Sequence, residues 1–382
     1  MTRARSSLPE PSTEALAHSE RVGRLISAQI AEAGGWIAFD RYMELALYAP
    51  GLGYYAAGAR KFGQAATGGD FVTAPEISPL FAQALATQLA PVMAATAPRI
   101  IEFGAGSGAL ARDLLAAFDA RGIAVDRYDI VELSADLHAR QRARLPDPRV
   151  RWLEAPPRQA AGVIIANEVL DVMPVRLFVR ERTGLRERGV SLQGGALAFA
   201  TRPADAALAA AVTEIERDVG TFDEGYGSEL GLAARGWLRS AEQWLSRGVL
   251  LAFDYGFPRR EYYHPQRLMG TLMCHYRHRA HADPLWLPGL NDITAHVDFT
   301  AMAQAAQEGG LEVLGYTTQG HFLLNCGLLD QLRDCRTPKT ASDAQRLVSE
   351  AEMGELVKVL AVGRGIEFPL LGFSRGDRTH TL

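Results

Sequence analysis

A glycine-rich segment at residues 102–108, with the sequence EFGAGSG, has the composition of a ligand-binding loop. It joins a predicted strand at 100–103 to a predicted helix at 109–120. Glycines at such a junction let the backbone turn sharply and approach a ligand closely, and the N-terminus of the following helix offers N–H groups to that ligand. Glu132 ends the next predicted strand, at 128–132, where a carboxylate can accept both hydroxyls of a ribose. The pattern therefore predicts a nucleoside cofactor.

Two cofactors are compatible with this loop. Together with Ala109, the glycines follow the spacing G-x-G-x-x-A, which favours a nicotinamide dinucleotide such as NAD. Glu102 stands two residues before the first glycine, where an acid can hold the ammonium group of a methionine moiety, which favours S-adenosylmethionine (SAM). A loop that only turns the chain is the third alternative, and the spacing of Glu132 argues against it. The candidate cofactor-binding residues are Glu102, Gly104, Ala105, Gly106, Ser107, Gly108, Glu132, Asn167 and Thr73.

A polar segment at 167–174, with the sequence NEVLDVMP, follows the next predicted core strand, at 162–166. In an open parallel sheet the carboxyl ends of the strands form the ligand crevice. We therefore expect Asn167, Glu168 and Asp171 to face the site. The alternative is that Asn167 or Asp171 caps a helix.

The elements needed to position these residues alternate between apolar strands and amphipathic helices from residue 99 onward. Such alternation is typical of βαβ units, so the predicted fold is α/β, with a doubly wound, mostly parallel Rossmann-like sheet. Further helices are predicted from Thr13 to the Gly34-Gly35 pair and at 39–48, 76–94, 135–144, 204–218, 229–246 and 297–308. Further strands are predicted at 150–153, 248–254, 311–317 and 357–362, with short antiparallel strands over 175–200. Residues 255–295 are expected to form a long connection without regular structure.

These elements suggest four segments along the chain. They are an N-terminal helical segment with a glycine-rich loop (1–72), the first part of the core (73–174), an inserted α+β subdomain (175–244) and the second part of the core (245–382). The insert is large enough to dock a folded protein, which favours a macromolecular substrate.

The composition excludes several classes of protein. The chain has 382 residues, 48% of them hydrophobic, which is ample for a buried core and excludes intrinsic disorder for most of it. A net charge of -4 disfavours a nucleic-acid binder that depends on phosphate contacts. No apolar run approaches the ~18–20 residues that span a bilayer, and the acids near the N-terminus argue against a targeting peptide, so the expected location is the bacterial cytoplasm. Cys274, Cys326 and Cys335 are too scattered for a disulfide scaffold.

A histidine-rich stretch within 255–295 places His275, His278 and His281 three residues apart. Three imidazoles can ligate zinc. Prolines and glycines around them predict a loop, however, and two arginines between them oppose a cation, so no metal is predicted. The stretch is expected to shape a lid or a substrate wall, the alternative being that its histidines bond to loop carbonyls. The candidate substrate-binding residues are His275, His278, Tyr263 and Asp254.

Several segments together resemble the MidA family, which includes the mitochondrial complex I assembly factor 7. They are GGDFVTAPEIS at 68–78, the glycine loop, YDIVE at 128–132, NEVLDVMP at 167–174, DYG at 254–256 and the run from Glu261 to Phe299. The long run is the most specific of them. The resemblance implies a class I SAM-dependent methyltransferase fold. Through the mitochondrial members it also implies symmetric dimethylation of an arginine in the NADH dehydrogenase subunit that corresponds to the 49 kDa subunit, which is an analogy for this chain.

An arginine acceptor would need a carboxylate beside it. A guanidinium is always protonated and its planar fork suits a carboxylate, which would orient the attacking nitrogen and accept its proton as the bond forms. Glu168 is the first candidate for this role, Asp171 the second and Glu76 the third.

Two other functions stay open. One is an NAD-dependent oxidoreductase that uses the same loop, and the other is a non-catalytic complex I assembly or interaction protein on a methyltransferase fold. The expected partner is a protein substrate, no nucleic acid is expected, and the oligomeric state is left open.

Overall fold

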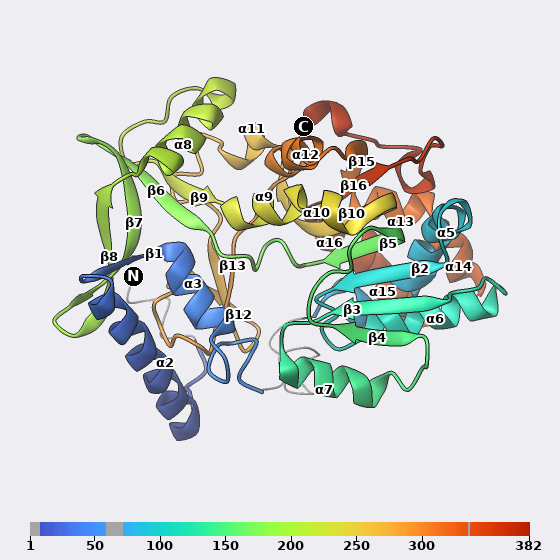
Figure 1. The fold of residues 1–382 in the computed structure, drawn as a ribbon, viewed down its shortest axis with the longest axis horizontal. Coiled ribbons are helices and arrows are strands. Elements are labelled where there is room, and N and C mark those ends of the chain that lie inside the picture. The colour runs from blue at the N-terminus through green and yellow to red at the C-terminus, as the bar shows by residue number, and fades with distance from the viewer. Residues whose placement is uncertain (1–7, 59–71, 335–336) are drawn as a thin grey trace. The chain divides into compact units, whose positions relative to one another are not determined.

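The computed structural model describes residues 8–58, 72–334 and 337–382 of the chain (Figure 1). Residues 68–71 of the family-like segment, with the glycines of the predicted loop there, and Cys335 lie outside these ranges. The chain divides into two compact units. The core unit comprises Val72–Leu170, Arg235–Gly256 and Phe299–Leu382, and the accessory unit comprises Met1–Phe71, Asp171–Ala234 and Phe257–Asp298. The four-segment division of the sequence stays a prediction.

The core unit is built on a mostly parallel sheet whose strands run in the order β15–β16–β10–β5–β2–β3–β4 (Figure 1). These strands are β2 (Arg99–Phe103), β3 (Arg127–Val131), β4 (Val150–Leu153), β5 (Ala160–Asn167), β10 (Leu245–Phe257), β15 (Glu312–Thr318) and β16 (Val357–Arg364). β16 pairs antiparallel with β10 and β15, and the pairs from β10 to β4 are parallel. The chain order reverses between β2 and β5, which makes their carboxyl ends the switch point where open α/β sheets bind ligands. The predicted α/β, doubly wound fold is confirmed.

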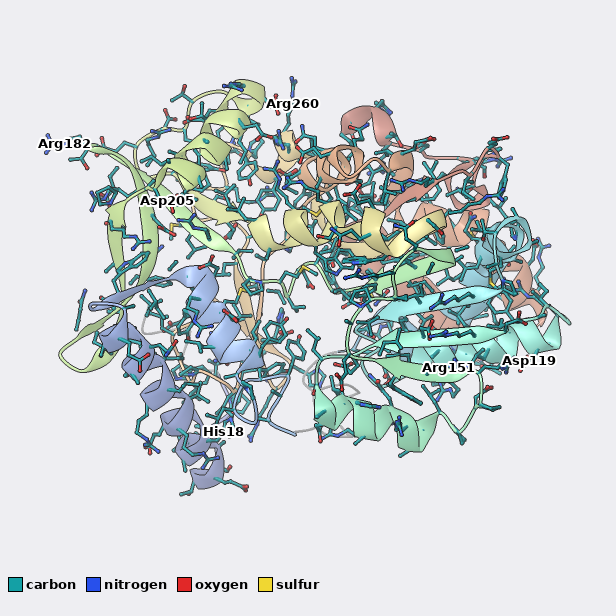
Figure 2. All side chains as sticks on the ribbon, viewed as in Figure 1. His18, Asp119, Arg151, Arg182, Asp205 and Arg260 are labelled. Carbon is teal, nitrogen blue, oxygen red and sulfur yellow. The ribbon has the colours of Figure 1, made fainter. Side chains whose placement is uncertain are left out.

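Each helix of the core unit buries at least one apolar side chain. They are α4 (Ala74–Ile77), α5 (Pro79–Ala95), α6 (Ala109–Ala120), α7 (Ala135–Arg144), α10 (Ala241–Trp244), α12 (Phe299–Glu308), α13 (Gln319–Asn325), α14 (Leu328–Asp334), α15 (Pro338–Val348) and α16 (Met353–Leu356), and α9 (Leu232–Arg239) joins the two units in sequence. The ring of Phe253 makes edge-to-face contacts with Phe81 at 5.4 Å and Phe322 at 5.2 Å. Asp119, labelled in Figure 2, lies near the end of α6. It pairs with Arg149 at 2.7 Å.

The predicted helix at 76–94 is interrupted at Ser78. Pro79 disfavours a helical conformation for the residue before it, and Ser78 is extended, with φ -159 and ψ 142. The Ser78 hydroxyl accepts a hydrogen bond from the backbone N–H of Leu80 and thereby caps α5. A separate short helix, α4, precedes this break. No helix among the described residues is both long enough and apolar enough to cross a membrane.

The accessory unit contains two antiparallel sheets. One has the order β1 (Trp36–Ala38), β7 (Gly184–Gln193), β6 (Arg176–Glu181), β9 (Gly227–Leu230), with β8 (Ala196–Pro203) paired to β7. The other has the order β12 (Arg279–His281), β11 (Met273–Tyr276), β13 (Asp292–Thr294). Its helices are α2 (Thr13–Glu32), α3 (Phe39–Tyr48), α8 (Ala206–Val219) and α11 (Arg259–Tyr262).

Two sequence-based expectations are wrong in this region. The predicted helix at 229–246 begins as strand β9, because its residues pair with β6, and becomes helical only from Leu232. The stretch 255–295 is not irregular, since it holds α11 and the three-stranded sheet. Its strands are three or four residues long and pair with one another, so a single-sequence pattern does not reveal them.

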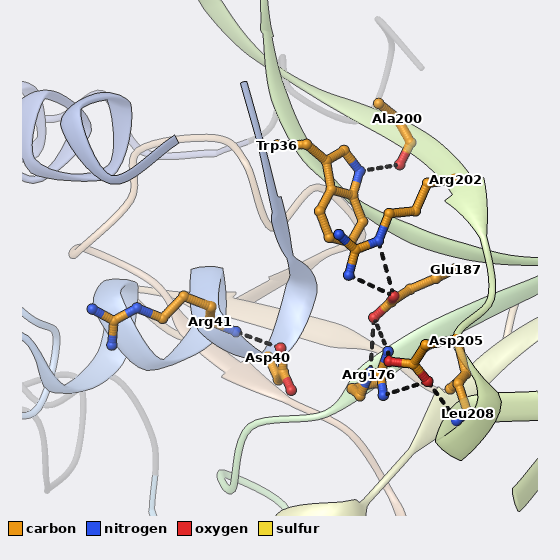
Figure 3. Close-up of polar contacts among 9 residues, drawn as sticks. All are labelled: Trp36, Asp40, Arg41, Arg176, Glu187, Ala200, Arg202, Asp205 and Leu208. Carbon is orange, nitrogen blue, oxygen red and sulfur yellow. Dashed lines mark hydrogen bonds and ion pairs between the residues drawn. The ribbon is translucent and has the colours of Figure 1, made fainter. Parts of the chain in front are cut away.

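A buried carboxylate, Glu187 on β7, holds the larger accessory sheet together (Figure 3). It is fully buried and pairs with Arg176 at 2.6 Å and with Arg202 at 3.2 Å. Arg176 also pairs with Asp205, the N-cap of α8, at 2.8 Å, and the guanidinium of Arg202 lies 3.6 Å from the ring centroid of Trp36. A buried charge needs such partners because desolvation alone is costly. The network joins the N-terminal strand and the inserted strands into one unit.

Candidate active site

The glycine loop leaves β2 at Phe103 and enters α6 at Ala109. Gly104, Gly106 and Gly108 have φ values of +61, +53 and +81, a left-handed conformation that L side chains rarely adopt. A Cβ on Gly104 would lie 3.2 Å from Val169 Cγ2, and one on Gly108 would lie 2.9 Å from Leu145 Cδ1. The turn therefore favours glycine at all three positions, and close packing also favours it at Gly104 and Gly108, as the sequence predicts for a loop that cradles a ligand.

Glu132 lies directly after β3 with both carboxylate oxygens oriented. Oε1 accepts a hydrogen bond from the backbone N–H of Ser134 at 2.9 Å, and Oε2 accepts one from the Gln141 amide at 2.9 Å. Burial raises the pKa of Glu132, and these hydrogen bonds oppose that rise. The next residue, Leu133, is 83% exposed. The sequence analysis does not single out Leu133 or Gln141. For Leu133, its position directly after Glu132, the predicted ribose-binding acid, is the signal that could have identified it.

Glu102 is buried in β2, with 3% of its surface exposed. Its Oε2 accepts a hydrogen bond from the Tyr128 hydroxyl at 2.7 Å. Burial raises the pKa of this carboxyl from 4.5 to about 7; the Tyr128 hydrogen bond lowers it and the charge of Glu132 raises it. The carboxyl is therefore ionised in only part of the molecules near neutral pH, unless a cation binds beside it.

This pKa predicts a pH-dependent cofactor affinity. If Glu102 holds the ammonium group, the affinity for S-adenosylhomocysteine should rise about tenfold from pH 6 to pH 8, as the carboxyl ionises around pH 7. The free energy of unfolding of the ligand-free protein should fall as pH rises between 4.5 and about 7. The reason is that the pKa of Glu102 is higher in the folded protein than its ordinary value. Calorimetric titration and thermal unfolding at several pH values measure both. A pH profile that Glu102→Gln leaves unchanged would remove Glu102 from the ammonium role.

Glu76 and the glycine loop, which are distant in sequence, are brought together. The Ser107 hydroxyl donates a short hydrogen bond to Glu76 Oε1. Thr73 precedes α4, and its carbonyl accepts the backbone N–H of Glu76 at 2.9 Å. The segment 73–77 therefore packs on the loop that the sequence assigns to the cofactor, which favours a role for Glu76 at the cofactor over one at the acceptor.

Asn167 and Glu168 lie at the carboxyl end of β5, adjacent to β2 in the sheet. Glu168 has φ +53, an uncommon conformation for a residue with a side chain, and such strain is concentrated at functional sites. Its backbone N–H donates to the Phe253 carbonyl at 2.8 Å. The Asn167 amide donates to Glu168 Oε1 at 3.3 Å. Glu168 is therefore a partly exposed carboxylate at the switch point.

Asp254 stabilises the turn that follows Glu168. It is fully buried, and its Oδ2 accepts the backbone N–H groups of Val169 at 3.1 Å and Leu170 at 2.8 Å. Oδ1 accepts the N–H of Tyr255 at 2.9 Å. These contacts correct the expectation that Asp254 binds substrate directly: a carboxylate with no exposed surface positions the Glu168 turn instead.

The remaining predicted residues belong to the accessory unit. Asp171 lies in a turn before β6, so the alternative that it caps a helix is wrong. Tyr263 is 3% exposed and donates its hydroxyl to the Glu229 carbonyl at 3.1 Å, which makes it a core residue and corrects its assignment to substrate. His275 is half-buried on β11, where burial lowers its pKa, and His278 is exposed in the β11–β12 turn. The described residues contain no cluster of three or more potential metal ligands.

Comparisons with known proteins agree with this geometry. Residues 83–317 match the family model described as "Putative S-adenosyl-L-methionine-dependent methyltransferase". A protein from Burkholderia thailandensis, whose crystal structure holds S-adenosyl-homocysteine, is 52% identical, with a TM-score of 0.94 over 98% of this chain and 100% of that chain. "Protein arginine methyltransferase NDUFAF7, mitochondrial" from Danio rerio is 28% identical over 88% of this chain and 83% of its own length. Its human counterpart is 28% identical over 77% and 70%.

The core unit fits the cofactor that these comparisons indicate. Three left-handed glycines, followed by a carboxylate with both oxygens oriented, suit a nucleoside with a ribose diol. The predicted cofactor, SAM, is confirmed by the family match and by the ligand of the 52% identical structure, so the NAD alternative is set aside. The chain belongs to the MidA family of SAM-dependent methyltransferases.

Proposed function

We propose that this protein transfers methyl groups from SAM to an arginine side chain of a protein. The observation that carries the proposal is Glu168, a partly exposed carboxylate in a left-handed conformation at the switch point of the sheet. The names of the relatives at 28% identity, protein arginine methyltransferases, support the same acceptor.

The proposed cofactor contacts lie in the core unit. The backbone from Gly104 to Gly108 approaches the cofactor, Glu132 accepts the ribose hydroxyls and Glu102 holds the ammonium group. Leu133, exposed beside Glu132, offers an apolar surface to the base. Thr73, directly before α4, and Asn167, at the end of β5, are the remaining proposed contacts. When bound, the cofactor supplies an electrophilic methyl group on a sulfonium.

Glu168 has two tasks in this proposal. Its carboxylate binds the protonated guanidinium and orients one nitrogen toward the methyl group, which lowers the entropic cost of the reaction. As the nitrogen is methylated, the proton that it loses passes to a carboxylate oxygen. Asp254 keeps the Glu168 turn in place through the N–H groups of Val169 and Leu170. Asp171 is the second candidate for contact with the guanidinium, and Glu76 the third.

The accessory unit is the proposed binding region for the substrate protein, with His275 and His278 as contact residues. The resemblance to the MidA family makes the counterpart of the 49 kDa NADH dehydrogenase subunit the first candidate substrate, and symmetric dimethylation the first candidate product. We also propose a cytoplasmic location, because the cysteines are scattered and Cys274 and Cys326 are free thiols.

Methylation of a defined substrate tests the proposal. The purified protein is incubated with SAM that carries a labelled methyl group and with the purified NADH dehydrogenase subunit. Mass spectrometry of the fragments should place the label on arginine, and substitution of that arginine by lysine should abolish it. Label on another residue type would contradict an arginine acceptor. Binding of S-adenosylhomocysteine without transfer to this subunit would contradict this substrate.

A further inference from the structure

A buried amide connects the two halves of the cofactor site. Gln141, on α7, has no exposed surface. Its Nε2 donates to the Gly106 carbonyl at 3.0 Å and to Glu132 Oε2 at 2.9 Å. We propose that Gln141 is a positioning residue that holds the glycine loop and Glu132 in register for cofactor binding. This role rests on the proposed contact between Glu132 and the ribose.

The orientation of the amide follows from its partners. The indole N–H of Trp152, on β4, is only a donor, and it points at Gln141 Oε1 at 3.0 Å. The NH₂ group must therefore face the two acceptors, the Gly106 carbonyl and Glu132. Both N–H donors and the oxygen of the Gln141 amide are used, so this buried side chain has one arrangement. It restrains the loop after β2, the residue after β3 and strand β4 relative to one another.

The same contact leaves Glu132 ready for a diol. Its Oε1 accepts a hydrogen bond from the Ser134 N–H and its Oε2 accepts one from Gln141, and the backbone of Leu133 also donates to the carboxylate. A carboxylate offers about four lone-pair positions, so Glu132 keeps capacity to accept from the ribose. Without Gln141, Glu132 would lose both its orientation and a donor that favours its ionised form.

Charged neighbours on the surrounding elements enter the pH dependence of this site. Glu102, on β2, is close enough for the charge of Glu132 to raise its pKa. On α7, His138 stacks on the Trp152 ring at 5.5 Å, and the Arg142 guanidinium lies 5.2 Å from the centre of that ring. All three groups are retained when Gln141 alone is changed, so a difference between variants reports on Gln141 and Glu132.

The test is calorimetric titration with S-adenosylhomocysteine from pH 6 to pH 8 in four proteins: wild type, Gln141→Glu, Gln88→Glu and Glu132→Gln. Gln141→Glu keeps the shape but replaces the donor group by a carboxylate oxygen that faces Glu132. Its affinity should be at least tenfold below wild type at pH 8. The gap between this variant and wild type should narrow toward pH 6, because a proton shared by the two carboxylates restores one donor. In wild type the affinity itself should fall toward pH 6, because Glu102 becomes protonated.

Gln88→Glu is the matched control. Gln88 lies on α5 of the same unit, is 1% exposed and accepts the Gly372 N–H at 2.8 Å through Oε1. It should bind as wild type does, after unfolding curves have shown that all four proteins are folded. Equal loss of affinity in both Gln→Glu variants would overturn the inference, and so would a wild-type pH profile in Gln141→Glu. Wild-type affinity in Glu132→Gln would overturn the ribose assignment and the inference with it. Loss in Glu132→Gln beside a wild-type profile in Gln141→Glu would overturn the inference alone.

Discussion

Glu168→Gln is expected to lower the turnover number for methyl transfer at least about 100-fold, since a positioned proton acceptor contributes on that order. The affinity for S-adenosylhomocysteine should stay unchanged, because glutamine has the same shape and the glycine loop is untouched. An amide neither attracts a guanidinium nor accepts its proton at neutral pH. Turnover is measured with labelled SAM and the substrate protein, and affinity by calorimetry.

Two further variants separate this role from general effects. Glu154→Gln makes the same change at an exposed position after β4 and should keep full activity. Glu168→Gly should be inactive yet more stable by about 1 kcal/mol, because glycine adopts φ +53 without the strain that glutamate bears. Full turnover in Glu168→Gln would exclude Glu168 from the chemistry. Loss of stability in Glu168→Gly would show that the left-handed conformation is not strained.

Gly106→Val is expected to abolish binding of S-adenosylhomocysteine, with at least about a 100-fold loss of affinity. Valine is β-branched and strongly disfavours φ +53, and its side chain would occupy the space through which the backbone approaches the cofactor. In a thermal unfolding experiment, ligand at ~100 times the wild-type dissociation constant should stabilise wild type by about 2.7 kcal/mol and the variant by at most about 0.4 kcal/mol.

The control for this variant is Gly122→Val. Gly122 follows α6 with φ +65, and a Cβ there would meet no atom within 4 Å. It therefore carries the same backbone strain in the same unit, without a place in the loop. Gly122→Val should be destabilised but should bind S-adenosylhomocysteine as wild type does. Tight binding by Gly106→Val, or equal loss in both variants, would refute the assignment of the loop to the cofactor.

Much of the core unit could be predicted because its signals are local. The predicted ranges of α6 and α7 agree with the structure, since the pattern that predicts a helix is a property of neighbouring residues. The glycine loop could be predicted for the same reason, because glycine readily adopts the left-handed conformations that occur at three positions between this strand and helix. The seven-residue helices α13 and α14 were not predicted. They are too short to be stable alone and depend on packing of residues such as Phe322.

The sequence by itself determined the α/β class, the nucleoside loop with its acid and the candidate Glu168, because each rests on local patterns and their spacing along the chain. Only the tertiary structure decided which side chains meet. Ser107 and Glu76 are 31 positions apart, Gly106 and Gln141 are 35 apart, and Val169 and Asp254 are 85 apart. Their contacts depend on the order of strands in the sheet, which local patterns do not encode. Burial likewise places Asp254 and Tyr263 in the interior, which differs from the substrate contacts that the sequence predicts for them.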